Sequence, residues 1–326
     1  MPPKPAQVLV HPSQFPDAIQ AALVQSLRTR KLNHKFLYDS LRQTRKWLEL
    51  HEACSPARND PDCLAIYDRA FETVSGLVRD PAIHLVGLGC GGGQKDVRLL
   101  ELFQGPARVL SYTPCDVSSA MVLVARSAAL RLTGTCQPLV CDLALTPDLQ
   151  EMVNQLSPLG ATRIITFFGM IPNFEPDTIL PRLADCLRET DLLLFSANLA
   201  PGSDYAAGVR RILPLYDNRL TREWLMLFLS DLGIGPGHGS LQFSIDASSF
   251  GLQRVVANFQ FSQPAQVRLG AETFEFATGE NFRVFFSYRY TPALVQQTLA
   301  QFGLEVSHEW VARSEEEGVF LVRKRT

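Results

Sequence analysis

The sequence predicts an α/β fold: a doubly wound, mainly parallel sheet with an inserted second domain of the α+β type. The first observation is that short apolar runs alternate with amphipathic stretches through the middle of the chain. The second is that this alternation stops after Asn198, and the third is that it returns near the C-terminus. The predicted strands are 83–88, 107–112, 137–141, 163–168 and 191–196, and the predicted helices are about 94–103, 118–131, 146–157 and 177–189.

The first predicted strand leads into a glycine-rich turn that leaves room for a ligand beside the backbone. Gly89, Gly91, Gly92 and Gly93 precede the first helix, and Asp116 follows the second strand about twenty-five residues later. Such an acid lies where the ribose hydroxyls of a nucleoside cofactor need an acceptor. The alternative is an ordinary strand-to-helix turn, with Asp116 as the N-cap of the helix that begins near Ser118.

Two further residues distinguish S-adenosylmethionine from NAD, which share this arrangement. Lys95 directly follows the glycines and suits a methionine carboxylate, although it could equally be a solvated lysine in a first helical turn. Asp142, followed by Leu143, ends the third strand, where an adenine amino group would find an acceptor. A dinucleotide would instead place its pyrophosphate at the helix N-terminus. The repeated acid favours S-adenosylmethionine.

Composition excludes several other classes of protein. The 326 residues are 46% hydrophobic, which is enough to form a full hydrophobic core. The net charge of -2 argues against binding of nucleic acid, which favours a strongly basic surface. No apolar run reaches membrane-spanning length and residues 1–5 lack a signal-peptide core, so we expect a cytoplasmic protein without a membrane partner. Seven cysteines without a CxxC pair and six scattered histidines predict neither disulfides nor a metal site. The oligomeric state is not given by the sequence.

The segments beyond Asn198 predict the second domain. A helix near 218–231 and strands near 253–260 and 265–276 interrupt the α/β pattern, which resumes with a strand at 282–290, a helix at about 291–302 and a strand at 318–323. This tail could add an antiparallel edge hairpin to the first sheet. We therefore expect a cofactor-binding domain from 63–200 plus 286–326, and a substrate-binding lid from 1–62 plus 201–285.

Six segments in register resemble the histidine-specific, S-adenosylmethionine-dependent methyltransferase family. They are Lys35-Phe36-Leu37-Tyr38-Asp39, the loop 89–95, 112–118, Phe167-Phe168-Gly169-Met170-Ile171-Pro172-Asn173, Tyr216-Asp217, and Gly279-Glu280 with Phe286-Ser287-Tyr288-Arg289-Tyr290. The resemblance covers nearly the whole chain. It implies a class I, Rossmann-like methyltransferase sheet with an inserted domain that closes over an amino-acid substrate.

The resemblance also implies roles for individual residues. The cofactor-binding positions are Gly89, Gly91, Lys95, Asp116, Asp142 and Leu143. The substrate positions are Asn173 and Tyr216 as anchors of the amino and carboxylate groups, Tyr38 closing over the amine as a candidate proton acceptor, and Ser287 against the substrate side chain. Each has a plainer alternative, since Asn173 could only shape a turn and the tyrosines could be core aromatics.

Four departures from the family pattern bear on function. Gly87 stands where the family has an acid before the glycines, Pro172 replaces a glycine before Asn173, and residues 54–58 (Cys54-Ser55-Pro56-Ala57-Arg58) lack an aromatic. Most important, Phe285 stands where the histidine enzymes carry a glutamate for the imidazole N–H. The sequence therefore predicts an N-methyltransferase for the amine of an amino acid or small amine, not histidine. The alternatives are a non-catalytic ligand-binding member of the fold and, with no catalytic donor identified, an NAD-dependent oxidoreductase.

Overall fold

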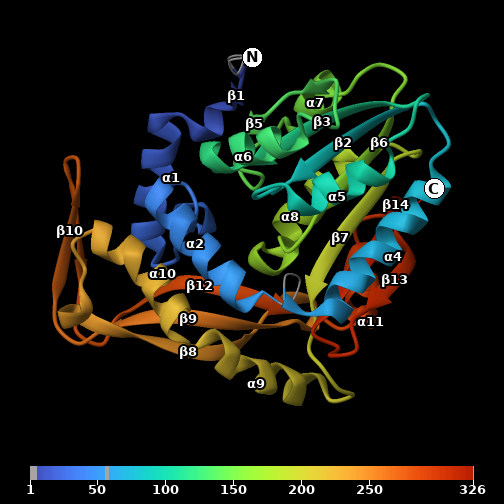
Figure 1. The fold of residues 1–326 in the computed structure, drawn as a ribbon. Helices are drawn as coiled ribbons and strands as arrows, with labels where there is room; N and C mark the ends of the chain where they lie inside the picture. The colour runs from blue at the N-terminus through green and yellow to red at the C-terminus, as the bar shows by residue number, and fades with distance from the viewer. Residues whose placement is uncertain (1–5, 56–58, 326) are drawn as a thin grey trace.

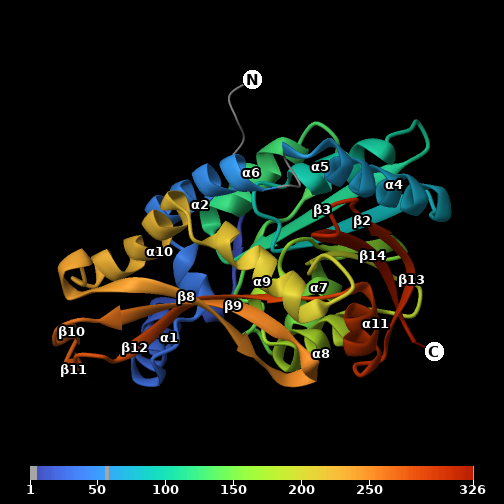
Figure 2. The same cartoon turned by 90° about the horizontal axis from the view of Figure 1, so that it is seen from below.

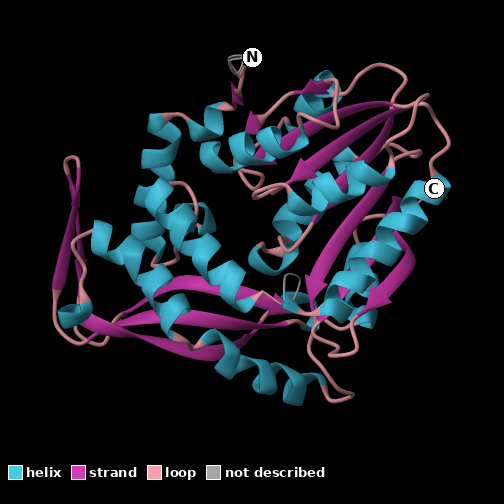
Figure 3. Cartoon of the chain, viewed as in Figure 1, coloured by secondary structure: helices cyan, strands magenta, loops and turns pink. Residues whose placement is uncertain are grey.

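The computed structural model describes residues 6–55 and 59–325, and its largest element is a nine-stranded, mostly parallel sheet (Figures 1 and 3). The strand order is β1-β5-β3-β2-β6-β7-β14-β13, with β4 paired to β3. The strands are β1 (Leu9–Val10), β2 (Ala82–Leu88), β3 (Val109–Asp116), β4 (Thr135–Cys136), β5 (Leu139–Val140), β6 (Thr162–Phe167), β7 (Leu192–Asn198), β13 (Leu304–Val311) and β14 (Glu317–Lys324). Among these strands only β14 runs against the others: it pairs antiparallel with β7 on one side and with β13 on the other, so that β13 and β14 form an edge hairpin. The predicted fold class is confirmed.

The helices that cover the central sheet begin and end close to the predicted residues, except α4, for which no range was predicted. They are α4 (Pro61–Leu77), α5 (Gln94–Leu102), α6 (Ser119–Ala129), α7 (Leu149–Leu156), α8 (Pro176–Cys186) and α11 (Pro292–Ala300). Apolar residues of α5, α6 and α4 pack on one face of the sheet, and those of α7, α8 and α11 pack on the other. This two-sided burial explains why the strands are nearly continuous apolar runs.

A second, three-stranded antiparallel sheet lies below the first in Figure 1, in the order β12-β9-β8. Its strands are β8 (Gly239–Ala247), β9 (Gln253–Phe261) and β12 (Asn281–Arg289). The predicted strand 282–290 thus forms but pairs with β9 rather than with the central sheet. The segment 265–276 is a hairpin of two strands, β10 (Ala265–Leu269) and β11 (Glu272–Phe276), at the far end of the small sheet (Figure 2).

N-terminal residues share a core with this small sheet. Leu27 of α1 (Pro16–Thr29) and Phe36 and Leu37 of the 3-10 helix η2 (His34–Leu37) lie in one buried cluster with residues of α10 (Arg219–Asp231), β9 and β12. Helix α2 (Leu41–Cys54) packs against α10, and α9 (Tyr205–Tyr216) against β8 and β9. The division into a cofactor domain and a lid stays a prediction, as does the role of residues 54–58, of which Pro56, Ala57 and Arg58 lie outside the described residues.

Candidate active site

The glycine-rich turn after β2 adopts backbone conformations that side chains rarely tolerate. Gly89, Gly91 and Gly93 have φ values of +66°, +52° and +75°. A Cβ at Gly89 would lie 2.6 Å from the Met170 side chain, and one at Gly93 would lie 2.7 Å from Ala125 Cβ. Glycine is therefore required by both conformation and space.

Asp116 at the end of β3 holds this turn in place. Its Oδ2 accepts a hydrogen bond of 3.0 Å from the Gly91 N–H, and its Oδ1 accepts one of 2.9 Å from the Ser118 N–H. Burial raises the pKa of Asp116, while these backbone hydrogen bonds lower it. The N-cap of α6 is Ser118, whose Oγ accepts from the Met121 N–H, so Asp116 is not that cap. Its predicted role as ribose acceptor stays a prediction.

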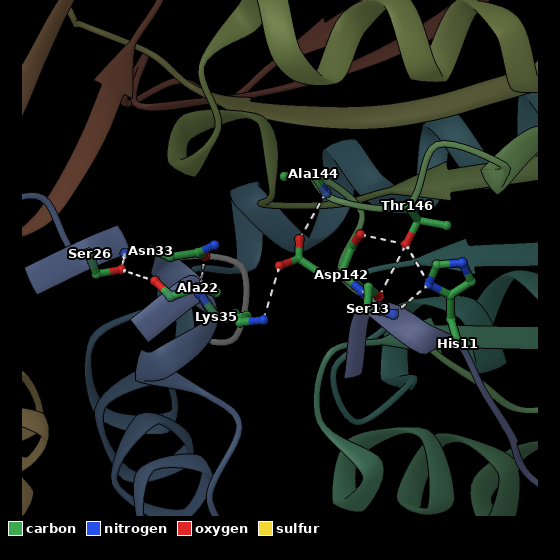
Figure 4. A network of polar contacts seen from close by, with 9 residues as sticks. All are labelled: His11, Ser13, Ala22, Ser26, Asn33, Lys35, Asp142, Ala144 and Thr146. Carbon is green, nitrogen blue, oxygen red and sulfur yellow. Dashed lines mark hydrogen bonds and ion pairs between the residues drawn. The ribbon is translucent and has the colours of Figure 1, made fainter. Parts of the chain in front are cut away.

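Asp142 follows β5 at the same edge of the sheet and is 4% exposed (Figure 4). Its Oδ1 accepts from the Ala144 N–H at 2.9 Å, and its own N–H donates to Ser13 Oγ at 3.0 Å. Its Oδ2 has no hydrogen-bond partner among the described residues. The carboxylate is thus fixed with one acceptor atom unused. The Leu143 side chain is buried in the core, and its predicted contact with the cofactor stays a prediction.

Lys95 lies over aromatic rings rather than in solvent. Its Nζ donates a hydrogen bond of 2.7 Å to the Tyr67 hydroxyl and is 4.0 Å from the centre of that ring. The Tyr67 hydroxyl donates in turn to Glu317 Oε1 at 2.6 Å. The half-buried lysine therefore lies beside the glycine turn, while its predicted contact with a methionine carboxylate stays a prediction.

A carboxylate from α5 fills the space left by the missing acid at position 87. A Cβ on Gly87 would lie 2.1 Å from Asp96 Oδ2. Asp96 is buried and accepts hydrogen bonds from the hydroxyls of Tyr112 at 2.6 Å and Thr166 at 2.7 Å. Burial raises the pKa of Asp96 to about 6. The chain thus keeps a buried acid behind the glycine turn but supplies it from the helix.

Asn173 lies against strand β12, and its role as a substrate anchor stays a prediction. It belongs to the 3-10 helix η3 (Ile171–Asn173), where Pro172 occupies the first turn and its lack of an N–H removes no helical hydrogen bond. The Asn173 Nδ2 donates to the Phe286 carbonyl at 2.7 Å. No described residue donates to its Oδ1, which leaves that oxygen free to accept from an amine.

Tyr216 and Ser287 come together through a residue that the sequence analysis did not assign. Arg289 Nη2 donates to the Tyr216 hydroxyl at 2.7 Å, and that hydroxyl donates to Ser287 Oγ at 2.8 Å. Arg289 is 8% exposed, and no carboxylate within ion-pair distance is found for it among residues 6–55 and 59–325. The spacing of Phe285, Ser287 and Arg289 by two residues places all three on one face of a strand, a pattern that could have indicated Arg289.

Phe285 lies among aromatic rings. His34 stacks on it with ring centres 5.3 Å apart, Trp224 meets it edge-on at 5.8 Å, and Tyr216 is 5.9 Å away. Glu280, which directly precedes β12, pairs with Arg30 and not with the groups around Phe285. The substrate end of the site is therefore apolar where relatives would be acidic.

Tyr38 follows η2 and packs against Trp47 and Trp224, with ring centres 5.8 and 5.6 Å away. Burial, and then the Asp116 carboxylate, raise the pKa of Tyr38 well above its usual range. Its hydroxyl therefore stays protonated near neutral pH. Tyr38 can orient an amine through a hydrogen bond, whereas loss of its own proton is strongly disfavoured.

These features fit S-adenosylmethionine. The turn offers backbone where a Cβ would collide, and Asp142 offers an unused buried acceptor at the neighbouring strand end. The model of the histidine-specific, S-adenosylmethionine-dependent methyltransferases matches residues 17–218 and 247–324. The chain belongs to this family. The predicted family and the choice of S-adenosylmethionine as cofactor are both confirmed.

Three individual relatives of known name share 26% identity or less with this chain. The chain is 26% identical over 249 residues to N-methyltransferase imqF of Aspergillus flavus, covering 72% of this chain and 65% of the relative, so it spans slightly under two thirds of that protein. It is 26% identical over 273 residues to histidine N-alpha-methyltransferase of Mycolicibacterium smegmatis, covering 78% of each. Among solved structures, magnesium protoporphyrin IX methyltransferase from Synechocystis PCC 6803 is 12% identical with a TM-score of 0.45, covering 89% of this chain and 97% of that one.

The described residues contain neither a membrane-spanning helix nor a cluster of metal-ligating side chains. Over 6–55 and 59–325 no helix is both long and apolar enough to cross a membrane. Within the same residues no group of three or more His, Cys, Asp or Glu side chains is placed to hold a metal ion.

Proposed function

We propose that this protein methylates the amine of an amino acid or a related small amine whose side chain is not an imidazole. The observation that carries the proposal is Phe285, which stacks with His34 and meets Trp224 where the family's histidine enzymes have a glutamate. An imidazole N–H placed against these rings would lose its acceptor, at a cost of about 1–3 kcal/mol. Both curated relatives carry names of N-methyltransferases, which supports nitrogen as the acceptor atom.

Residues of this chain would supply orientation rather than acid-base chemistry. S-adenosylmethionine provides an electrophilic methyl group. The amine nitrogen must face this group in its neutral form, with a free lone pair. We assign the orientation of that nitrogen to Asn173 Oδ1 and the Tyr38 hydroxyl. Because the pKa of Tyr38 is raised, the amine's proton would leave to solvent water rather than to a tyrosinate.

The direction of one hydrogen-bond chain narrows the substrate further. Arg289 can only donate, so the Tyr216 hydroxyl accepts from it and directs its own hydrogen to Ser287. Asn198 Nδ2 also donates to Ser287 Oγ, at 3.4 Å. The Ser287 hydrogen is left without an acceptor among the described residues. A substrate group at this end would therefore meet the Ser287 hydroxyl as a hydrogen-bond acceptor.

The test is methyl transfer by the purified protein to a panel of amines. The panel contains L-histidine, L-phenylalanine, L-tyrosine and L-tryptophan, each beside its decarboxylated amine, with products identified by mass spectrometry. We expect at least one aromatic substrate to exceed histidine by tenfold or more in kcat/KM. Histidine methylated at least as efficiently as every aromatic member of the panel would refute the proposal.

A pair of variants at position 285 separates charge from shape. Phe285→Glu restores the acid and should raise histidine methylation relative to the aromatic substrates, whereas Phe285→Leu, the matched apolar control, should not. If both variants change histidine methylation equally, the missing acid is not what excludes histidine.

A further inference from the structure

Lys35 is a buried cation at the cofactor end of the site that the proposed function does not use. It lies in η2, three residues before Tyr38, and is 4% exposed. Its Nζ is 3.7 Å from Asp142 Oδ2 (Figure 4). That distance is an ion pair but too long for a hydrogen bond.

Both facing atoms are unsatisfied. Neither Lys35 Nζ nor Asp142 Oδ2 has a hydrogen-bond partner among the described residues, although the two side chains are only 3% and 5% exposed. Buried charged groups are normally hydrogen-bonded as well as paired, because water no longer serves them. A donor and an acceptor thus stand side by side without partners.

The hydrogen bonds around Asp142 and Lys35 fix both residues in place. Asp142 Oδ1 is fixed by the Ala144 N–H, and the Thr146 hydroxyl donates to the Asp142 carbonyl at 2.7 Å. The Ser13 hydroxyl, 3.3 Å from that of Thr146, fixes the Asp142 N–H. On the other side, Asn33 Oδ1 caps η2 by accepting from the Lys35 N–H at 3.0 Å. Backbone on both sides is anchored, which holds the two charged atoms 3.7 Å apart, beyond hydrogen-bond distance.

We propose that Lys35 Nζ and Asp142 Oδ2 together recognise the edge of the cofactor's adenine ring. Adenine carries an amino donor directly beside ring-nitrogen acceptors, a pattern that a neighbouring acceptor and donor can bind at once. The amino group donates to Asp142 Oδ2, and a ring nitrogen accepts from Lys35 Nζ. Lys35 is therefore a cofactor-contact residue. The inference rests on the family's cofactor and not on the proposed amine substrate.

The test is calorimetric binding of S-adenosylhomocysteine and its 1-deaza and 7-deaza analogues, each lacking one ring nitrogen. We expect Lys35→Met to weaken S-adenosylhomocysteine binding by about ten- to a hundredfold. Lys31→Met, at an exposed lysine four residues earlier, is the matched control and should bind as the parent does. The parent protein should bind at least one analogue more weakly than S-adenosylhomocysteine. In Lys35→Met this difference in affinity between S-adenosylhomocysteine and that analogue should disappear.

Two results would overturn the proposal. The first is equal affinity of the parent protein for S-adenosylhomocysteine and both analogues, a measurement that needs no variant. The second is a deficit for each analogue that is unchanged in Lys35→Met, because Lys35 would then act only by pairing with Asp142.

Folding is controlled separately, since Lys35→Met leaves a buried carboxylate unpaired. The double variant Lys35→Met/Asp142→Asn removes both charges, and circular dichroism checks each sample before titration. In the double variant we again expect no deficit for the analogue that identifies the Lys35 contact, and a persisting deficit would contradict the proposal. Because no methyl acceptor enters these titrations, their outcome is independent of whether the proposed substrate class is right.

Discussion

At the scale of single residues, Asp116 connects the glycine turn to the predicted ribose site. Its two oxygens hold the N–H groups of Gly91 and Ser118, and each keeps a lone pair for a ribose hydroxyl. We predict that Asp116→Ala weakens binding of S-adenosylhomocysteine by about ten- to a hundredfold, through loss of ~1.5–3 kcal/mol of charged hydrogen bonding. Calorimetry on a folded sample measures this. Unchanged affinity would remove Asp116 from the site.

Gly87 offers a second residue-scale prediction, on stability. A Cβ there would lie 2.1 Å from Asp96 Oδ2, an atom already fixed by Tyr112. We expect Gly87→Ala to lower the free energy of unfolding by about 1–3 kcal/mol through overpacking, measured by denaturant titration. Gly76→Ala in α4, with nothing within 4 Å of its Cβ, is the control and should cost nothing. In the background of Asp96→Ala the cost of Gly87→Ala should shrink; an undiminished cost would place the strain elsewhere.

At the scale of elements, the central strands were predictable because burial on both faces makes them apolar throughout. Strand β2 and helix α5 lie within a residue or two of their predicted limits. Helix α9 and strands β8 and β13 were missed. Residues of β8 are exposed or half-buried along nearly its whole length, and β13 is largely exposed. Neither strand therefore carries a strong apolar run.

The placement of Phe285 could not have been predicted from strand periodicity. The pairing of β12 with β9 shifts register between Arg283 and Phe285, which marks a β-bulge. As a result Phe282, Val284 and Phe285 all join the core beside Trp224, although strict alternation would have separated Val284 from Phe285. The residue substitution was visible in the sequence, but its aromatic surroundings come from α10 and η2, elements distant along the chain.

The contact between η2 and β12 predicts a pH dependence. His34 Nε2 accepts a hydrogen bond of 3.2 Å from the Phe286 N–H, and burial, followed by the charge of Arg283, lowers the pKa of His34 to about 3. Between pH 6.5 and about 3, His34 binds a proton in the unfolded chain but stays neutral in the folded protein. The free energy of unfolding therefore decreases as pH falls from about 6.5 towards 3. Between pH 7.5 and 5.5 we expect a loss of about 1 kcal/mol from this residue.

Comparison with His34→Gln isolates this contribution, since glutamine keeps an acceptor but does not titrate. The stability difference between the two proteins, from denaturant titrations at several pH values, should fall as pH falls below 6.5. A difference that stays constant from pH 7.5 to 5.5 would contradict a neutral, buried His34.

At the scale of the whole molecule, the N-terminal segment joins the two sheets. Residues of η2 share a core with the small sheet, and Lys35 of the same turn reaches Asp142 at the edge of the central sheet. Thr44 of α2 meets Ser118 at the start of α6, with hydroxyl oxygens 3.2 Å apart. The prediction that 1–62 belongs to the lid depended only on the order of segments along the chain. The contacts that connect it to the cofactor edge depend on three-dimensional packing that no local pattern encodes.

This arrangement predicts that cofactor binding slows backbone hydrogen exchange both at the central sheet and in the N-terminal segment that packs on the small sheet. If the turn at residues 34–38 closes on the bound cofactor, its backbone N–H groups should exchange with solvent more slowly when S-adenosylhomocysteine is present. Hydrogen exchange read by mass spectrometry should show protection in the glycine turn, near Asp116 and in peptides covering 34–44. Peptides of the hairpin β10–β11, at the far end of the small sheet, serve as the internal control and should not change. Protection confined to the central sheet would show that the N-terminal segment does not respond to cofactor, and equal protection of the hairpin would point instead to a general tightening of the fold.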